Sequence, residues 1–147
     1  MNLQSLLCGM DYVVLQENDS YEKNEIKNIT CNSKKVSRGD LFVCIDGTVH
    51  DGHDYMEEAW KRGAEVLVVE KIGKHGHLFD FPENLTVFLV RDTREAYAQM
   101  AANYFGHPAE FLKIIGITGT KGKTTVSVMI RQMLETQGIR TGLIGTL

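Results

Sequence analysis

The sequence predicts an α/β fold, with a small mixed α/β domain followed by the first βαβ unit of a parallel-sheet domain. Two observations predict it. Strand-like apolar runs alternate with helix-like segments as far as residue 105. After Pro108 a strand pattern, a glycine-rich turn, a helix pattern and a second strand pattern follow in that order. The sequence therefore predicts two units, residues 1–107 and residues 108–147.

Three runs in the first unit are typical of buried strands. They are residues 41–45 (LFVCI), 65–70 (EVLVVE) and 86–90 (TVFLV), which are rich in β-branched and aromatic side chains. A shorter apolar segment at 26–30 precedes the turn-like stretch CNSKKVSRGD. The segment between the second and third strand contains Gly73, Gly76 and Pro82, so we interpret it as a linker.

Three other segments of this unit repeat apolar residues at helical spacing. The spacing predicts a short N-terminal helix over residues 3–10 and a second helix over residues 54–62 that ends at Gly63. The third, residues 93–105, begins with Asp92 and Glu95 in a capping-box arrangement and stops at Gly106. Its predicted apolar stripe consists of Ala96, Tyr97, Met100, Ala101, Tyr104 and Phe105.

Composition excludes several classes of protein. A formal net charge of -3 and a pI near 5.9 provide no basic surface for nucleic acid. No apolar stretch has the roughly 18 residues that a membrane helix needs, and the N-terminus lacks the features of a signal peptide. We therefore expect a cytoplasmic protein. Its cysteines, Cys8, Cys31 and Cys44, form no CxxC pair, and we expect them to be reduced and mostly in the core.

The strongest chemical signal lies between the predicted strand at 112–117 and the helix that follows it. This segment consists of Gly119, Thr120, Lys121, Gly122, Lys123, Thr124 and Thr125. Its two glycines permit backbone conformations that direct N–H groups toward a polyphosphate, and the helix presents its positive end to the same charge. Lys123 is the predicted catalytic residue, reaching the β- and γ-phosphates of ATP, and the Thr124 hydroxyl is the predicted Mg²⁺ ligand.

This loop departs from the common phosphate-binding pattern, because Ile117 stands where that pattern has its first glycine. TGTxGKTT after a strand resembles the ATP-binding loop of the Mur ligases and their folylpolyglutamate-synthetase relatives. Three segments of the first unit resemble the N-terminal domain of the MurE type of this family. They are Asn32-Ser33-Lys34, RGDLFV at residues 38–43, and Asp51-Gly52-His53.

The resemblance implies a site for the uridine diphosphate end of a substrate in the first unit. Carried over position by position, its contacts are Cys31, Ser33, Thr48, Val49 and His50. The family has Asp and Arg where this chain has Asn32 and Lys34. Because lysine is only a point charge, a bidentate contact made by that arginine is not expected here.

The resemblance also implies a reaction. The whole protein would be an ATP- and Mg²⁺-dependent ligase of peptidoglycan precursor synthesis, a cytoplasmic monomer. It would add a diamino acid, L-Lys or meso-diaminopimelate, to UDP-MurNAc-L-Ala-D-Glu through an acyl phosphate. The chain would be an inactive N-terminal fragment of it. Two alternatives remain open: another Mur or folylpolyglutamate-type ligase, and a nucleotide-binding module that does not catalyse.

Overall fold

The computed structural model describes residues 1–18, 25–70 and 82–145. The chain divides into two compact units, Met1–Pro108 and Ala109–Leu147, and each is described by itself. Most of the predicted linker between residues 70 and 86 lies outside the described residues. No helix in the described parts of the chain is long and apolar enough to cross a membrane.

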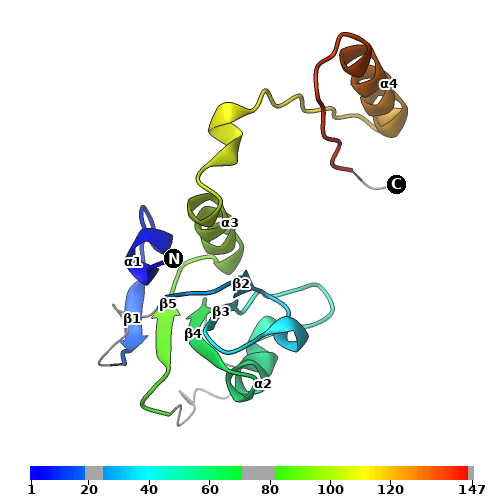
Figure 1. The fold of residues 1–147 in the computed structure, drawn as a ribbon. Coiled ribbons are helices and arrows are strands. Elements are labelled where there is room, and N and C mark those ends of the chain that lie inside the picture. Colours follow the sequence, from blue (N-terminus) through cyan, green and yellow to red (C-terminus); the bar gives the residue numbers. More distant parts are fainter. Residues whose placement is uncertain (19–24, 71–81, 146–147) are drawn as a thin grey trace. The chain divides into compact units, whose positions relative to one another are not determined.

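A five-stranded mixed sheet forms the centre of the first unit, which confirms the predicted α/β class (Figure 1). The strands lie in the order β1-β5-β4-β3-β2. Strands β2 to β5 run parallel to their neighbours, and β1 pairs antiparallel with β5. Their bounds are β1 Val13–Gln16, β2 Ile29–Thr30, β3 Asp40–Val43, β4 Ala64–Val69 and β5 Thr86–Leu89.

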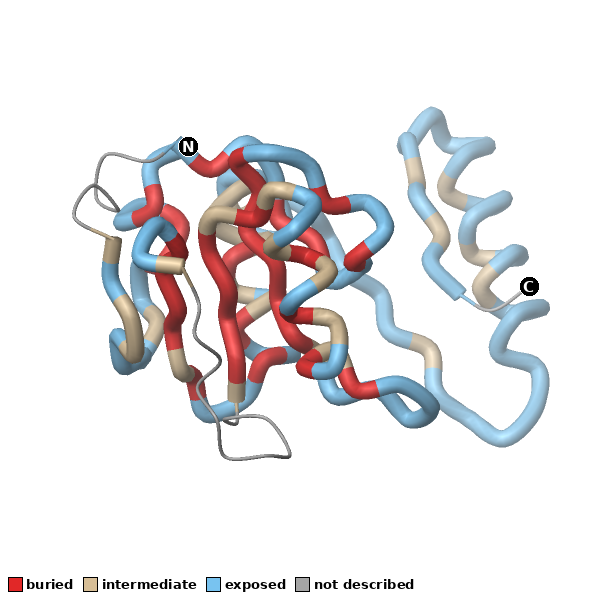
Figure 2. Tube along the Cα trace, turned by 90° about the horizontal axis from the view of Figure 1, so that it is seen from below, coloured by how far each residue is buried: buried red, intermediate tan, exposed pale blue. Residues whose placement is uncertain are grey.

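Helices cover both faces of this sheet. Helices α1 (Leu3–Leu6) and α3 (Thr93–Tyr104) pack on one face, and α2 (Met56–Lys61), preceded by the 3-10 turn η3 (Gly52–Tyr55), packs on the other. Alternate residues of a strand point to opposite faces, so Leu41 and Val43 belong to the first apolar cluster and Phe42 to the second. Figure 2 shows the buried residues concentrated along these strands.

Helix α3 begins where the sequence predicts. The Asp92 carboxylate accepts the backbone N–H of Arg94 at 2.8 Å and of Glu95 at 3.0 Å, and these bonds hold its pKa below the usual value. The helix ends at Tyr104, and Phe105 is its C-cap. Because its backbone has left the helical conformation, the Phe105 side chain is 69% exposed. Its predicted place in the buried stripe was wrong.

Other details of the first unit also differ from expectation. Helix α1 ends at Leu6 rather than continuing to residue 10, and Gly9 has a positive φ of 75°. Strand β1 was not predicted. All three cysteines are free, but only Cys44 is buried, whereas Cys8 and Cys31 are exposed. Burial raises the pKa of the Cys44 thiol, which disfavours its reactive thiolate form.

The second unit contains the 3-10 turn η4 (Pro108–Phe111) and the predicted helix, α4 (Lys123–Thr136). The structure forms no strand at 112–117 or 141–144, where the sequence predicts the two strands of the βαβ unit. A parallel strand needs a neighbour to complete its hydrogen bonds, and no strand elsewhere in the described part of this unit supplies one. Ile114 and Ile115 accordingly remain 75% and 58% exposed.

Candidate functional site

The carboxyl ends of β2, β3, β4 and β5 meet at one edge of the sheet, because these strands are parallel. The residues after β2 and β3 include all five predicted substrate contacts. Glu70 follows β4, and Asp92 and Thr93 follow β5 at the start of α3. Open α/β sheets bind ligands at this edge, so the topology brings the two predicted contact segments to a suitable place.

Ser33 opens the 3-10 turn η2 (Ser33–Lys35) just after β2. Only 8% of its surface is exposed, and its hydroxyl donates to the Glu58 carboxylate on α2 at 2.9 Å. The preceding Asn32 caps the turn, since its side-chain oxygen accepts the Lys34 N–H at 3.0 Å. The structure thus assigns Ser33 a partner that lies 25 positions away in sequence, which local patterns could not reveal.

Cys31 lies beside Tyr97 of α3, at the same end of the sheet as Ser33 but toward the face that α3 covers. Burial raises the pKa of the Tyr97 phenol, and the neighbouring Cys31 thiol raises it further through its charge interaction and a hydrogen bond. Tyr97 was predicted as a core residue of α3, and it is partly buried against the first apolar cluster. A tyrosine hydroxyl beside Cys31 adds a polar group that the sequence did not indicate.

The predicted contacts Thr48, Val49 and His50 occupy the exposed tip of a short hairpin after β3. Asp46 and Asp51 form an isolated antiparallel bridge at its base. Two backbone bonds close the hairpin, from Gly47 N–H to the His50 carbonyl at 2.9 Å and from Gly52 N–H to the Ile45 carbonyl at 2.8 Å. Val49 is 82% exposed. The geometry therefore presents these three residues to solvent on a defined base.

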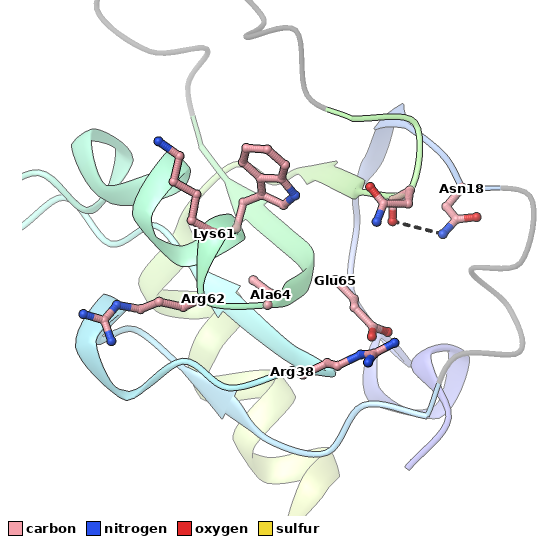
Figure 3. Close-up of a pocket in the computed structure, with 9 residues that line it drawn as sticks. Asn18, Arg38, Lys61, Arg62, Ala64 and Glu65 are labelled. Atoms are coloured by element: carbon pink, nitrogen blue, oxygen red, sulfur yellow. Dashed lines mark hydrogen bonds between the residues drawn. The ribbon is translucent and has the colours of Figure 1, made fainter.

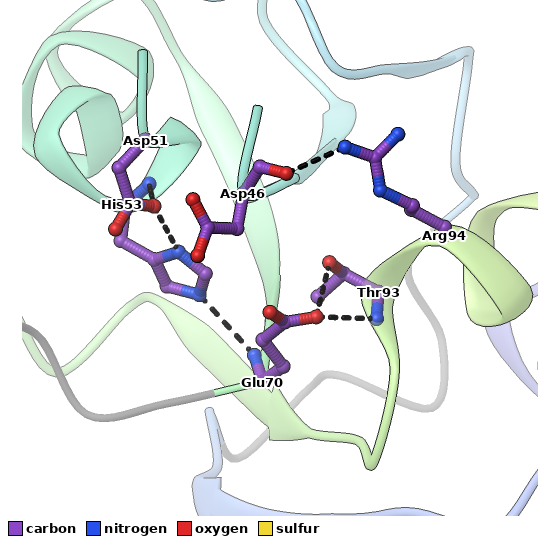
Figure 4. A network of polar contacts seen from close by, with 6 residues as sticks. All are labelled: Asp46, Asp51, His53, Glu70, Thr93 and Arg94. Atoms are coloured by element: carbon purple, nitrogen blue, oxygen red, sulfur yellow. Dashed lines mark hydrogen bonds and ion pairs between the residues drawn. The ribbon is translucent and has the colours of Figure 1, made fainter. Parts of the chain in front are cut away.

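Asp51 and His53 form the buried base of this hairpin (Figure 4). Asp51 accepts the His53 backbone N–H at 3.0 Å and the His53 Nδ1–H at 2.6 Å. The other ring nitrogen, Nε2, accepts the Glu70 backbone N–H at 3.2 Å, which assigns the ring proton to Nδ1. His53 is 3% exposed. It therefore ties the hairpin to the end of β4, a role that the sequence did not suggest.

Both sides of the hairpin are also connected to the first turn of α3 (Figure 4). Arg94 donates from Nη2 to the Asp46 carbonyl at 2.6 Å. Glu70 accepts from the Thr93 backbone N–H at 2.9 Å and from its hydroxyl at 2.8 Å. With Asp92 on the next two amides, the N-terminal donors of α3 are already satisfied within the protein, so this helix end is not an open anion site.

The predicted phosphate loop lies at the start of α4 in the second unit. Gly122 is the N-cap with φ 77°, and Gly119 has φ 150°, conformations that favour glycine. No side chain caps the helix, and residues 119–125 are all exposed, so the first-turn N–H groups face solvent. The Lys123 ammonium donates to the Gly119 carbonyl at 2.7 Å. This loop thus combines exposed amides, a positive helix end and a lysine charge.

A pocket of about 560 Å³ lies at the other edge of the sheet, where β4 begins (Figure 3). Its lining includes Arg38, Trp60 and Glu65, and none of the predicted site residues. Two of the basic side chains that line it already form ion pairs. Lys61 Nζ lies 2.6 Å from Glu57 Oε1, and Arg62 Nε lies 3.1 Å from Glu58 Oε1. This hollow is therefore separate from the predicted contacts.

Comparison with known proteins identifies the family. Residues 25–105 match the family model described as Mur ligase family, catalytic domain, which is more than half of the chain. The chain belongs to the Mur ligase family. This match lies within the first unit and includes the three segments that resemble the MurE type. The phosphate loop lies outside it.

Individual relatives agree with this placement. The Mur ligase chain is 46% identical over its whole length to a UDP-N-acetylmuramoyl-L-alanyl-D-glutamate–2,6-diaminopimelate ligase from Clostridium perfringens, and covers 28% of that protein. A solved ligase of the same name matches 99% of the chain and 27% of its own with a TM-score of 0.67, and at 20% identity this likeness concerns the fold alone. The MurF ligase from Thermotoga maritima in complex with ADP is 31% identical with a TM-score of 0.53, over 75% of this chain and 23% of its own. The chain therefore spans about a quarter of the length of the curated relatives that it matches, from 23% to 29%.

Proposed function

We propose that the whole protein is an ATP-dependent ligase that adds 2,6-diaminopimelate to UDP-MurNAc-L-Ala-D-Glu in peptidoglycan precursor synthesis. The observation that carries the proposal is the 46% identity over all 147 residues to a ligase named for this reaction. The same name recurs among the similar relatives, for example at 43% identity in Aquifex aeolicus. This favours diaminopimelate over lysine, the two amino acids that the sequence leaves open. The proposed enzyme is a cytoplasmic monomer.

The first unit, residues 1–107, is proposed to hold the uridine end of the substrate. Support comes from the sheet topology. Cys31 and Ser33 follow β2, the hairpin with residues 48–50 follows β3, and these neighbouring strands are parallel, so both segments lie at the same end of the sheet. Backbone groups and hydroxyls at such an edge can pair with the donors and acceptors of a uracil or ribose. The exposed hairpin tip supplies accessible groups, and its buried base keeps them in place.

The second unit, residues 108–147, is proposed to begin the ATP-binding domain. The residues fit a polyphosphate, since the α4 amides and the loop from Gly119 to Thr125 are exposed and uncapped. Lys123 would hold the β- and γ-phosphates by charge, and the Thr124 hydroxyl would hold Mg²⁺. ATP supplies the phosphoryl group that turns the substrate carboxylate into an acyl phosphate, from which the amine displaces phosphate and loses a proton. Positioning and charge neutralisation are the loop's contribution.

The proposal is tested with the full-length enzyme and UDP-MurNAc-L-Ala-D-Glu. ADP release should depend on 2,6-diaminopimelate, and L-lysine should replace it poorly. Lys123→Ala should lower the rate by at least about a hundredfold, because its charge lies where phosphoryl charge develops. Lys113→Ala, an exposed lysine before the loop, is the matched control and should keep its activity. Circular dichroism and the melting temperature verify that each variant is folded.

Three results would contradict parts of the proposal. ADP release that needs a different amino acid or a folate would favour another ligase of the same family. A complete absence of ligation with intact nucleotide binding would favour the non-catalytic module. Normal turnover in Lys123→Ala would remove the proposed role of the phosphate loop.

A further inference from the structure

We propose that Glu58 is a positioning residue that fixes the Ser33 hydroxyl as a hydrogen-bond acceptor toward the ligand, and so determines selectivity for uracil over cytosine. The inference rests on the proposed uridine site and deepens it. Glu58 belongs to α2, and no sequence motif in the chain indicates a part for it in binding. What assigns the role is its position between two donors.

Both carboxylate oxygens of Glu58 are engaged. Oε2 accepts the Ser33 hydroxyl at 2.9 Å, and Oε1 accepts Arg62 Nε–H at 3.1 Å. Arg62 is the C-cap residue of α2, four positions after Glu58, so this bond holds the carboxylate on the side of the helix that Arg62 occupies. A carboxylate only accepts, and Ser33 has a single proton, so that proton points to Glu58.

Ser33 is then left with lone pairs alone for any other partner. A ligand atom beside this oxygen must be a donor, such as the N3–H of a uracil ring or a ribose hydroxyl. Cytosine has an unprotonated N3, an acceptor, which would face the Ser33 lone pairs without a hydrogen. Because Ser33 is 8% exposed, little water can relieve such a mismatch. In the proposed site the N3 edge of the base, rather than a ribose hydroxyl, lies at this oxygen, and with the base there the arrangement favours UDP over CDP.

The variant Glu58→Gln reverses this polarity with almost no change in shape. Arg62 Nε–H can only donate, so it selects the carbonyl oxygen of the new amide for the Oε1 position. The amide nitrogen then faces Ser33 and donates to its oxygen, which frees the hydroxyl proton to point toward the ligand. We expect Glu58→Gln to accept cytosine N3 better and uracil N3–H worse than the unchanged protein.

The experiment is an NMR titration of the 147-residue chain with UDP and with CDP, following the backbone amides of residues 31–35 and 48–50. The unchanged chain should bind UDP more tightly. In Glu58→Gln the ratio of the two affinities should fall by about 2- to 10-fold, the range of one hydrogen bond. Glu57→Gln is the matched control. It is the neighbouring carboxylate on the same helix, pairs with Lys61 rather than Ser33, and should keep the original ratio.

Further variants separate positioning from simple structural damage. Ser33→Ala should lose part of the discrimination, and Glu58→Gln should have no additional effect on the ratio in its presence, because both act through one hydroxyl. An unchanged UDP to CDP ratio in folded Glu58→Gln would overturn the inference while the uridine site stands. UDP-induced shifts that avoid residues 31–35 and 48–50 in the unchanged chain would instead overturn the proposed site itself.

Discussion

Gly52 lies at the base of the exposed hairpin, where the neighbouring backbone leaves no room for a side chain. A Cβ built there would lie 2.6 Å from the Ile45 nitrogen, 2.7 Å from its carbonyl oxygen and 2.9 Å from the Cys44 carbonyl carbon. These are backbone atoms of the two residues that follow strand β3, so no rotamer change can relieve the contact. Each residue of the DGH segment thus has its own structural role. Asp51 caps the turn η3, Gly52 avoids a clash with the backbone of Ile45, and the buried His53 bonds to the Glu70 amide.

Gly52→Ala should therefore destabilise the first unit by at least about 2 kcal/mol, after allowing for the smaller entropy of the unfolded alanine chain. This corresponds to a fall in melting temperature of roughly 10 °C for a unit of this size, measurable by thermal denaturation. Gly116→Ala is the control, since a Cβ there has nothing within 4 Å and its φ is not positive. Equal melting temperatures for the two variants would contradict the steric argument.

Individual residues also show the limits of reading a site from sequence. The segments that carry the predicted contacts are placed at one edge of the sheet, because residues after parallel strands must lie there. Burial of Ser33 and its bond to Glu58, by contrast, join positions 25 residues apart. The roles of Glu58, Arg94 and Glu70 depend on such distant pairings, which no local pattern encodes. The predicted burial of Phe105 was wrong for a local reason, because an error of one residue at the end of a helix moves a side chain from the core to solvent.

At the scale of elements, the first turn of α3 serves as an anchor for the hairpin. Arg94 holds the Asp46 carbonyl at 2.6 Å on one side of it. On the other side the connection passes from Asp51 through His53 and Glu70 to Thr93. Removing Arg94 should release one side and leave the buried connection intact, because the two share no hydrogen bond.

We expect Arg94→Ala to make the amides of Gly47 and Gly52 exchange their hydrogens about fivefold faster, as the loss of about 1 kcal/mol in a local opening would do. Both amides are hydrogen-bonded within the hairpin, which makes them direct reporters. Arg91→Ala changes an exposed arginine just before Asp92 and should leave both rates unchanged. Identical protection in Arg94→Ala and the unchanged chain would show that the guanidinium does not stabilise the hairpin.

Element prediction succeeded where a pattern was long or carried its own end signals. Strands β3, β4 and β5 and helices α3 and α4 lie within a few residues of expectation, because each has a sustained apolar run or a recognisable cap. Strand β1 was missed, since its apolar run is only the three residues 13–15 and its partner β5 lies more than seventy positions later. The patterns at 112–117 and 141–144 are strand-like, but a strand also needs a neighbour, which a segment cannot supply alone.

At the scale of the molecule, the apolar core of the first unit is built from residues of that unit. Both apolar clusters and the residues packed on them come from positions up to 104. The second unit is the reverse case. No residue of α4 is buried, and the apolar side chains Val126, Met129 and Met133 are exposed. Burial of apolar surface is the main favourable term in folding, so the two units should differ sharply in their ability to fold alone.

Residues 1–108 expressed alone should therefore fold, with an amide spectrum that overlays that of the same residues in the 147-residue chain except near the new end. Its melting temperature should lie within about 3 °C of the value for the first unit in the whole chain, since no cluster residue has been removed. The complementary peptide 109–147 is the control. Helix α4, which has 14 residues, is marginal in isolation, so the amides of the peptide should show little protection from exchange. Loss of the native spectrum in 1–108, with recovery when 109–147 is added, would mean that the first unit depends on the second for its stability.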